Sequence, residues 1–71
     1  MRNYRHELIK RAREKGDYTV IWLAAQAGVS TMQWWRLENG RSASLELVMR
    51  ACELLDLDWR KIIYRRFSRA A

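Results

Sequence analysis

The side chains of this sequence that could do chemistry are spaced for binding rather than for catalysis. No nucleophile stands beside a base, no pair of carboxylates has a spacing suited to acid–base work, and no glycine loop could hold a phosphate. His6 has no second ligand at metal spacing, so we expect a solvated position on a helix for this residue. The sequence therefore predicts no enzyme, no metal site and no cofactor.

The charge balance predicts an anionic partner. Fourteen Lys and Arg against eight Asp and Glu give a net charge of +6 in 71 residues. Such an excess suits DNA, RNA or a membrane surface, and charge alone does not choose among them. Because the sequence has neither a signal-peptide pattern nor a long apolar run, we expect a soluble cytoplasmic protein. Cys52, the single cysteine, is expected to be a buried reduced thiol.

The elements that must position these side chains are predicted to be helices. A hydrophobic content of 49%, no Pro, three Gly and no alternating strand-like run favour one all-α domain over residues 1–71, with its core at about residues 4–67. Side chains suited to helix N-termini are Thr19, Ser30, Ser44 and Asp58, and Gly28 suits the left-handed backbone of a tight turn. We expect a compact five-helix bundle, with helices over residues 4–16, 19–27, 30–39, 44–55 and 58–67.

The apolar periodicity also predicts which side chains form the core. Trp34 and Leu37 are the expected inward pair of the third helix. The apolar positions of the last two helices are Leu45, Val48, Cys52, Leu55, Trp59, Ile62, Ile63 and Phe67. We expect the fifth helix to close the core, whereas an alternative places Tyr64 and Phe67 in a homodimer contact.

The second and third predicted helices, joined through residues 27–30, form a helix-turn-helix pattern. Residues from about 5 to 59 resemble the Cro/C1 repressor family, also called the XRE family, in Leu23-Ala24, Gly28-Val29-Ser30 and Leu37-Glu38-Asn39-Gly40. The resemblance implies a lambda-repressor-like fold and a DNA-binding transcriptional regulator. It also implies a dimer on a two-fold site, with the third helix in the major groove.

The resemblance further implies a set of DNA-contacting residues. The positions that read bases in relatives match Thr31, Met32 and Arg36, and Arg36 suits a bidentate pair with guanine. Gln33 is expected to reach adenine or a phosphate, and helical rotation places Trp35 on the same outward face. The positions after the third helix that contact the DNA backbone match Asn39 and Arg41.

Apolar residues stand where such a surface usually carries polar ones. Val20 takes the place of a Gln found in many relatives, and Ile21 and Trp22 follow it. We expect Val20, Ile21, Met32 and Trp35 to form one exposed apolar patch. An alternative function is therefore a protein-binding module, natural or engineered on a repressor scaffold, that uses this patch and Trp22. Readout of thymine methyl groups by Met32 or Trp35 is the explanation that keeps DNA as the partner.

Overall fold

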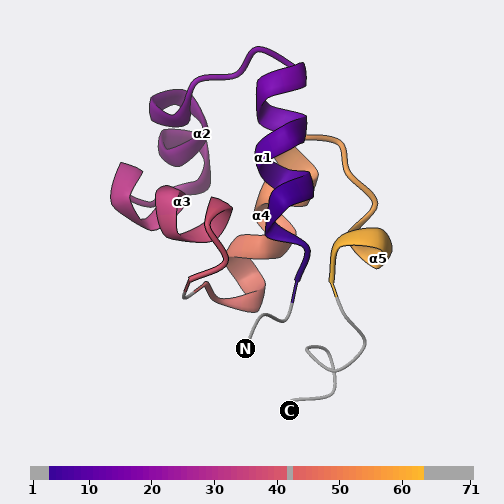
Figure 1. The fold of residues 1–71 in the computed structure, drawn as a ribbon. Helices are drawn as coiled ribbons and strands as arrows, with labels where there is room; N and C mark the ends of the chain where they lie inside the picture. The colour runs from indigo at the N-terminus through magenta and orange to yellow at the C-terminus, as the bar shows by residue number, and fades with distance from the viewer. Residues whose placement is uncertain (1–3, 42, 64–71) are drawn as a thin grey trace.

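The computed structural model describes residues 4–41 and 43–63 and confirms the all-helical class. Figure 1 shows the order of its helices. They are α1 (His6–Lys15), α2 (Val20–Ala27), α3 (Thr31–Glu38), α4 (Leu45–Leu54) and α5 (Trp59–Ile62). Among the described residues, no helix is long and apolar enough to cross a membrane.

Four of the five helices in the described residues begin at the predicted side-chain caps. The side chains of Thr19, Ser30, Ser44 and Asp58 each accept a hydrogen bond from a backbone N–H in the first turn of the helix that follows. The turn between α2 and α3 depends on Gly28, whose φ of 74° is left-handed. The Gly28 turn and the Ser30 cap fix the spacing of α2 and α3. The positions of the caps and of the turn were predictable from single residues.

The first helix begins later than its apolar pattern suggests. Tyr4, expected inside that helix, precedes it and forms an isolated antiparallel bridge with Ile63. Its hydroxyl donates a hydrogen bond of 2.6 Å to the carbonyl of Leu37 at the end of α3. The prediction for Tyr4 was wrong because a contact between distant parts of the chain outweighs the local period.

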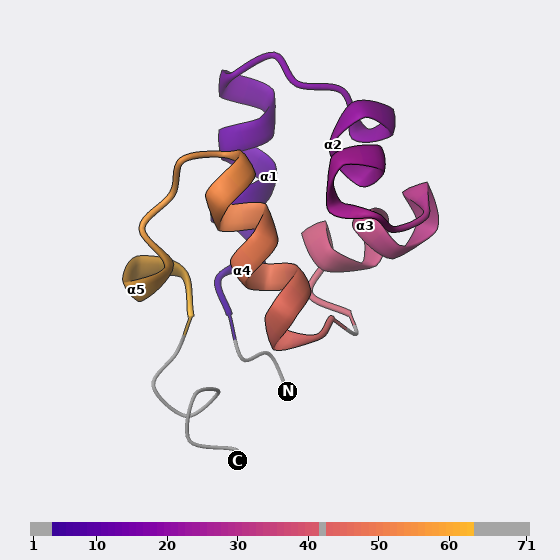
Figure 2. The same ribbon diagram turned by 180° about the vertical axis from the view of Figure 1, so that it is seen from behind.

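The bundle packs around Trp34, which has no exposed surface. Leu37 is equally buried, which confirms the predicted inward pair of α3. Helix α2 packs against α3 and α4, α1 packs against α3, and α5 packs against α1 and α4. Figure 2 shows the same arrangement from behind, with α4 across the middle of the bundle.

Three predictions for the last two helices were wrong. Leu45 is 40% exposed and Trp59 is 42% exposed, although both were expected in the core. Helix α5 ends at Ile62, because Ile63 is extended and pairs with Tyr4. The predicted core position of Phe67, and the alternative homodimer contact through Tyr64 and Phe67, lie outside the described residues.

Cys52 is buried in α4, as predicted. Burial raises the pKa of its thiol to about 11, with a smaller contribution from the negative charge of Asp58. A thiol in this state is a poor nucleophile at neutral pH, so Cys52 serves packing.

Candidate functional site

Helices α2 and α3 form one side of the molecule, on the opposite side of the bundle from α5 (Figures 1 and 2). Large apolar side chains are exposed here: Ile21 is 74% exposed, Met32 57% and Trp35 50%. A folded domain rarely leaves several such side chains together in water unless the surface has a partner. We call this surface the α2–α3 face, defined by the exposed residues of 21–22, 31–36 and 41 together with the half-buried Val20 and Asn39.

A groove of about 440 Å³ opens on the α2–α3 face. Val20 from the start of α2 lines it, together with Thr31, Met32 and Trp35 from α3. The structure therefore brings together three of the four residues of the expected apolar patch. Ile21, the fourth, is exposed but does not line the groove.

The C-terminal turn of α3 places a cation beside Trp35. Gly40 adopts a φ of 66°, and the backbone N–H of Arg41 then donates to the carbonyl of Arg36 at 2.9 Å. The guanidinium carbon of Arg41 lies 5.9 Å from the centre of the Trp35 ring, within the range of a cation–π contact. Asn39 donates its side-chain amide to the carbonyl of Trp35 at 2.8 Å. Arg41 and Trp35 thus form a single unit at the end of α3.

Two residues of the predicted set, Gln33 and Trp22, have partners within the protein. The Gln33 side-chain oxygen accepts a hydrogen bond from the backbone N–H of Ser30 at 2.9 Å, which completes a capping box with the Ser30 hydroxyl. Trp22 stacks on Tyr18, with ring centres 5.6 Å apart. Thr31 and Arg36 are exposed at the predicted positions on α3.

The electrostatics of the α2–α3 face are positive. Helix α2 carries no charged residue, and α3 carries only Arg36 and Glu38. Glu38 is buried and paired, whereas Arg36 and the following Arg41 are exposed. Within these two fully described helices, no carboxylate therefore faces solvent.

Glu38 joins α3 to α1 from beneath the face. Its carboxylate accepts hydrogen bonds from Arg13, at 2.5 Å from Nε and 3.1 Å from Nη2, and from the Trp34 indole N–H at 2.6 Å. The hydrogen bond to Glu38 raises the pKa of Arg13. We did not predict this cluster from the sequence, although a buried Trp34 with an acceptor four residues later was a usable signal. The cluster fixes α3 relative to α1.

His6 also belongs to this connection, so its predicted solvated position was wrong. Its side chain is 16% exposed, and Nδ1 donates to the backbone carbonyl of Glu38 at 2.8 Å. Nδ1 must carry the proton, because a carbonyl oxygen only accepts. Nε2 is buried without a hydrogen-bond partner among the described residues and lies 3.9 Å from the Glu7 carboxylate.

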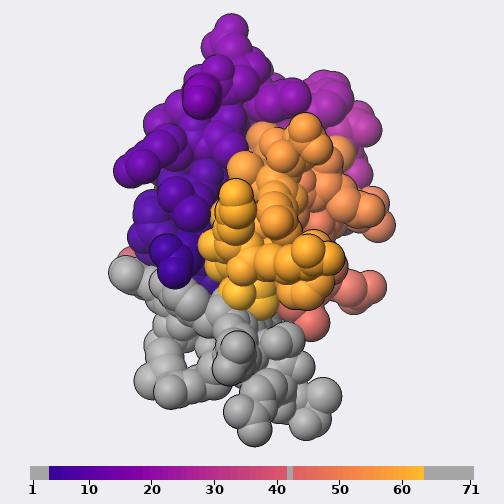
Figure 3. Space-filling model, turned by 90° about the vertical axis from the view of Figure 1, so that its right-hand side faces the viewer, coloured from indigo at the N-terminus to yellow at the C-terminus, as the bar shows by residue number. Residues whose placement is uncertain are grey.

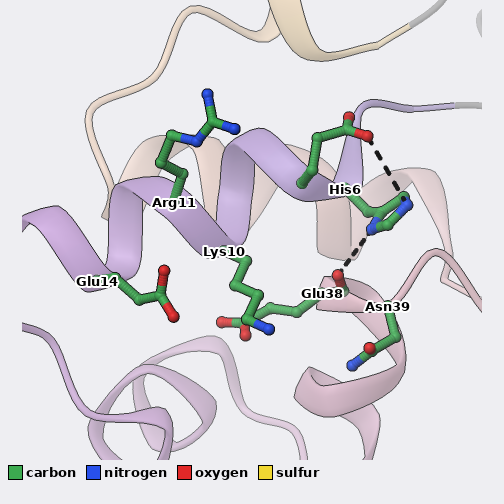
Figure 4. Close-up of a pocket in the computed structure, with 7 residues that line it drawn as sticks. His6, Lys10, Arg11, Glu14, Glu38 and Asn39 are labelled. Atoms are coloured by element: carbon green, nitrogen blue, oxygen red, sulfur yellow. Dashed lines mark hydrogen bonds and ion pairs between the residues drawn. The ribbon is translucent and has the colours of Figure 1, made fainter.

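A second cavity, of about 360 Å³, lies beside His6 between α1 and the end of α3 (Figure 4). Its lining mixes both charge signs, with Lys10 and Arg11 among the carboxylates of Glu7, Glu14 and Glu38. The described part of the chain contains no group of three side chains suited to hold a metal ion. The mixed charges make this cavity a poorer site for an anionic partner than the α2–α3 face.

The opposite side of the molecule is viewed in Figure 3, where α1 and α5 face the reader. Trp59 of α5 is exposed there, with the guanidinium carbon of Arg60 5.8 Å from its ring centre. This pair repeats the chemistry of Trp35 and Arg41 on a different helix. It therefore offers a matched control for experiments on the α2–α3 face.

Comparisons with known proteins agree with this geometry. A family model described as a helix-turn-helix domain matches residues 7–60, which include α2, the Gly28 turn and α3. The sequence comparison with curated proteins gave no match. The family match supports a DNA-binding regulator in general.

Proposed function

Because the chain belongs to a helix-turn-helix domain family of the XRE/Cro kind, we propose that it is a Cro/C1-type transcriptional regulator that reads duplex DNA through α3. The observation that carries this proposal is the charge of the α2–α3 face. Arg36 and Arg41 are exposed there, and the only carboxylate of α2 and α3 is buried in the pair with Arg13. A duplex presents phosphates on both sides of its major groove, so a face without exposed carboxylates suits it.

The DNA contacts divide into base-reading and backbone-contacting groups on this proposal. Thr31, Met32, Trp35 and Arg36 point outward from α3 and would meet base edges, with Arg36 suited to the two acceptors of guanine. Gln33 would use its amide nitrogen, because its oxygen already caps the helix. The remaining contacts, to phosphates, would come from Asn39 and Arg41. Two copies of the chain would occupy a two-fold site.

Binding to random-sequence duplex DNA at several salt concentrations tests this proposal. Phosphate contacts release counterions, so the logarithm of the binding constant should fall by about 0.9 per contact for each tenfold rise in salt. Arg41→Ala should reduce that slope by about 1. Lys61→Ala is the matched control, because Lys61 is an exposed cation on α5, and it should leave the slope unchanged.

A protein-binding module is the second candidate function, and the apolar groove favours it. Met32 and Trp35 line the groove, and Ile21 beside it is the most exposed large apolar side chain described. Aromatic, Met and Arg residues are enriched at the centres of protein interfaces. Absence of duplex binding at about 50 mM salt would favour this candidate over DNA. Trp35→Ala should then weaken the partner complex by about 2 kcal/mol or more.

A further inference from the structure

The groove on the α2–α3 face is lined mostly by apolar side chains, so it suits an apolar group. Val20, Met32 and Trp35 supply apolar surface, and the Thr31 hydroxyl and the Trp35 indole N–H are the only side-chain hydrogen-bonding groups of the four lining residues. A polar base edge placed against the apolar walls would lose its water without gaining a partner. The groove therefore disfavours the hydrogen-bond donors and acceptors that make up most of a base pair's edge in the major groove.

One apolar group occurs on the base edges of the major groove, and that group is the C5 methyl of thymine. We propose that the groove binds the C5 methyl of a pyrimidine, so that the chain reads methylation of DNA bases as well as sequence. This inference rests on the proposed function, since it requires α3 to enter the major groove. It deepens that function by naming the chemical group that the apolar residues recognise.

The residue types of the groove extend this recognition from thymine to 5-methylcytosine. Both bases carry the methyl on the same ring carbon, but thymine has an acceptor at position 4 and cytosine has a donor. The Thr31 hydroxyl can donate or accept a hydrogen bond, so it satisfies either group. The groove consequently selects for the methyl and does not separate the two methylated bases.

Two contacts hold the walls of the groove in place. Arg41 lies over the Trp35 ring at 5.9 Å, and Asn39 donates to the Trp35 carbonyl at 2.8 Å. Arg41 also brings its charge to the edge of the groove, where a neighbouring phosphate would bind it. The burial of one methyl should raise affinity about fourfold for each methylated position that enters the groove.

Competitive selection from duplex pools tests the proposal with defined chemistry. The probes are random-sequence duplexes of about 20 base pairs, made with thymine or with uracil, and with cytosine or with 5-methylcytosine. Uracil lacks only the methyl of thymine, and 5-methylcytosine gains only the methyl. The wild-type protein should enrich thymine at one or more fixed positions. Its affinity should fall about fourfold when uracil replaces thymine at such a position. A duplex with 5-methylcytosine there should bind about fourfold more tightly than the same duplex with cytosine.

Matched variants locate the effect on the protein. Trp35→Ala should abolish the fourfold preference for the methyl, with helical circular dichroism retained. Trp59→Ala should keep the preference, since Trp59 has the same exposed aromatic chemistry and the same Arg neighbour, at 5.8 Å, on α5.

Two results would overturn the inference, and they differ from each other. Salt-dependent DNA binding with equal affinity for methylated and unmethylated pools would refute methyl reading while the proposed function stands. No binding to any pool at low salt would refute both and leave a protein as the partner of the groove.

Discussion

Replacement of Glu38 by Gln should destabilise the domain strongly, although it changes few atoms. Glu38 is 5% exposed and Arg13 19% exposed, so the substitution leaves a partly buried guanidinium without the carboxylate that it pairs with. Breaking a fully buried pair typically costs about 3 to 5 kcal/mol. Because water reaches part of Arg13, and because Gln retains one acceptor for the Trp34 indole, we expect about 2 to 3 kcal/mol.

Urea unfolding followed by tryptophan fluorescence measures this cost. A chain of 71 residues has a total stability of about 4 to 10 kcal/mol. In urea the stability of such a small domain falls by about 1 to 1.5 kcal/mol per M, so the loss expected for Glu38→Gln should lower the unfolding midpoint by about 2 M. Arg13→Met should have a similar cost, because it leaves the carboxylate buried and unpaired. The double variant should cost less than the sum of the single variants by more than 1 kcal/mol. Additive costs, or a loss below about 0.5 kcal/mol for Glu38→Gln, would refute the assigned ion pair.

Three further predictions concern the scaffold. Gly28→Ala should cost about 1 to 2 kcal/mol in urea unfolding, because a side chain is strained at a φ of 74° even though the space around Gly28 is open; an unchanged midpoint would contradict this. Tyr4→Phe should cost about 1 to 2 kcal/mol through loss of the hydrogen bond to Leu37, and equal stability of the two proteins would show that this bond contributes nothing. Between about pH 8 and pH 10.5, wild type should lose about 2 kcal/mol more stability than Cys52→Ala, because the unfolded thiol releases its proton near its ordinary pKa of 9.0 and the buried thiol only near a pKa of about 11. Parallel pH profiles for these two proteins would exclude that contribution from Cys52.

Local signals in the sequence predicted the helices that depend on single residues. The caps at Thr19, Ser30 and Ser44 and the turn at Gly28 are formed by neighbours in the chain, and the structure contains each of them. Helix α5 shows where such signals fail, since its predicted length ignored the pairing of Ile63 with Tyr4. A pairing across nearly the whole chain leaves no local pattern.

The candidate site was likewise predictable from the sequence only where it depends on local structure. The outward position of Met32 and Trp35 followed from helical rotation on α3, and both side chains are exposed. The groove also includes Val20 of α2, so it depends on how α2 packs against α3. The spacing of apolar residues within one helix does not specify that packing. The contact of Arg41 with Trp35 likewise depends on the left-handed turn at Gly40.

The four tryptophans provide the most direct test that the α2–α3 face is the DNA-binding surface. Trp35 lies in the groove, Trp22 stacks on Tyr18 beside it, Trp34 is buried, and Trp59 lies on α5. Nuclear magnetic resonance resolves one indole N–H signal for each during titration with random-sequence duplex DNA. The signal of Trp35 should shift most, and that of Trp59 should stay in place. A shift of Trp59 with an unchanged Trp35 would contradict the account and assign DNA binding to the opposite side of the molecule.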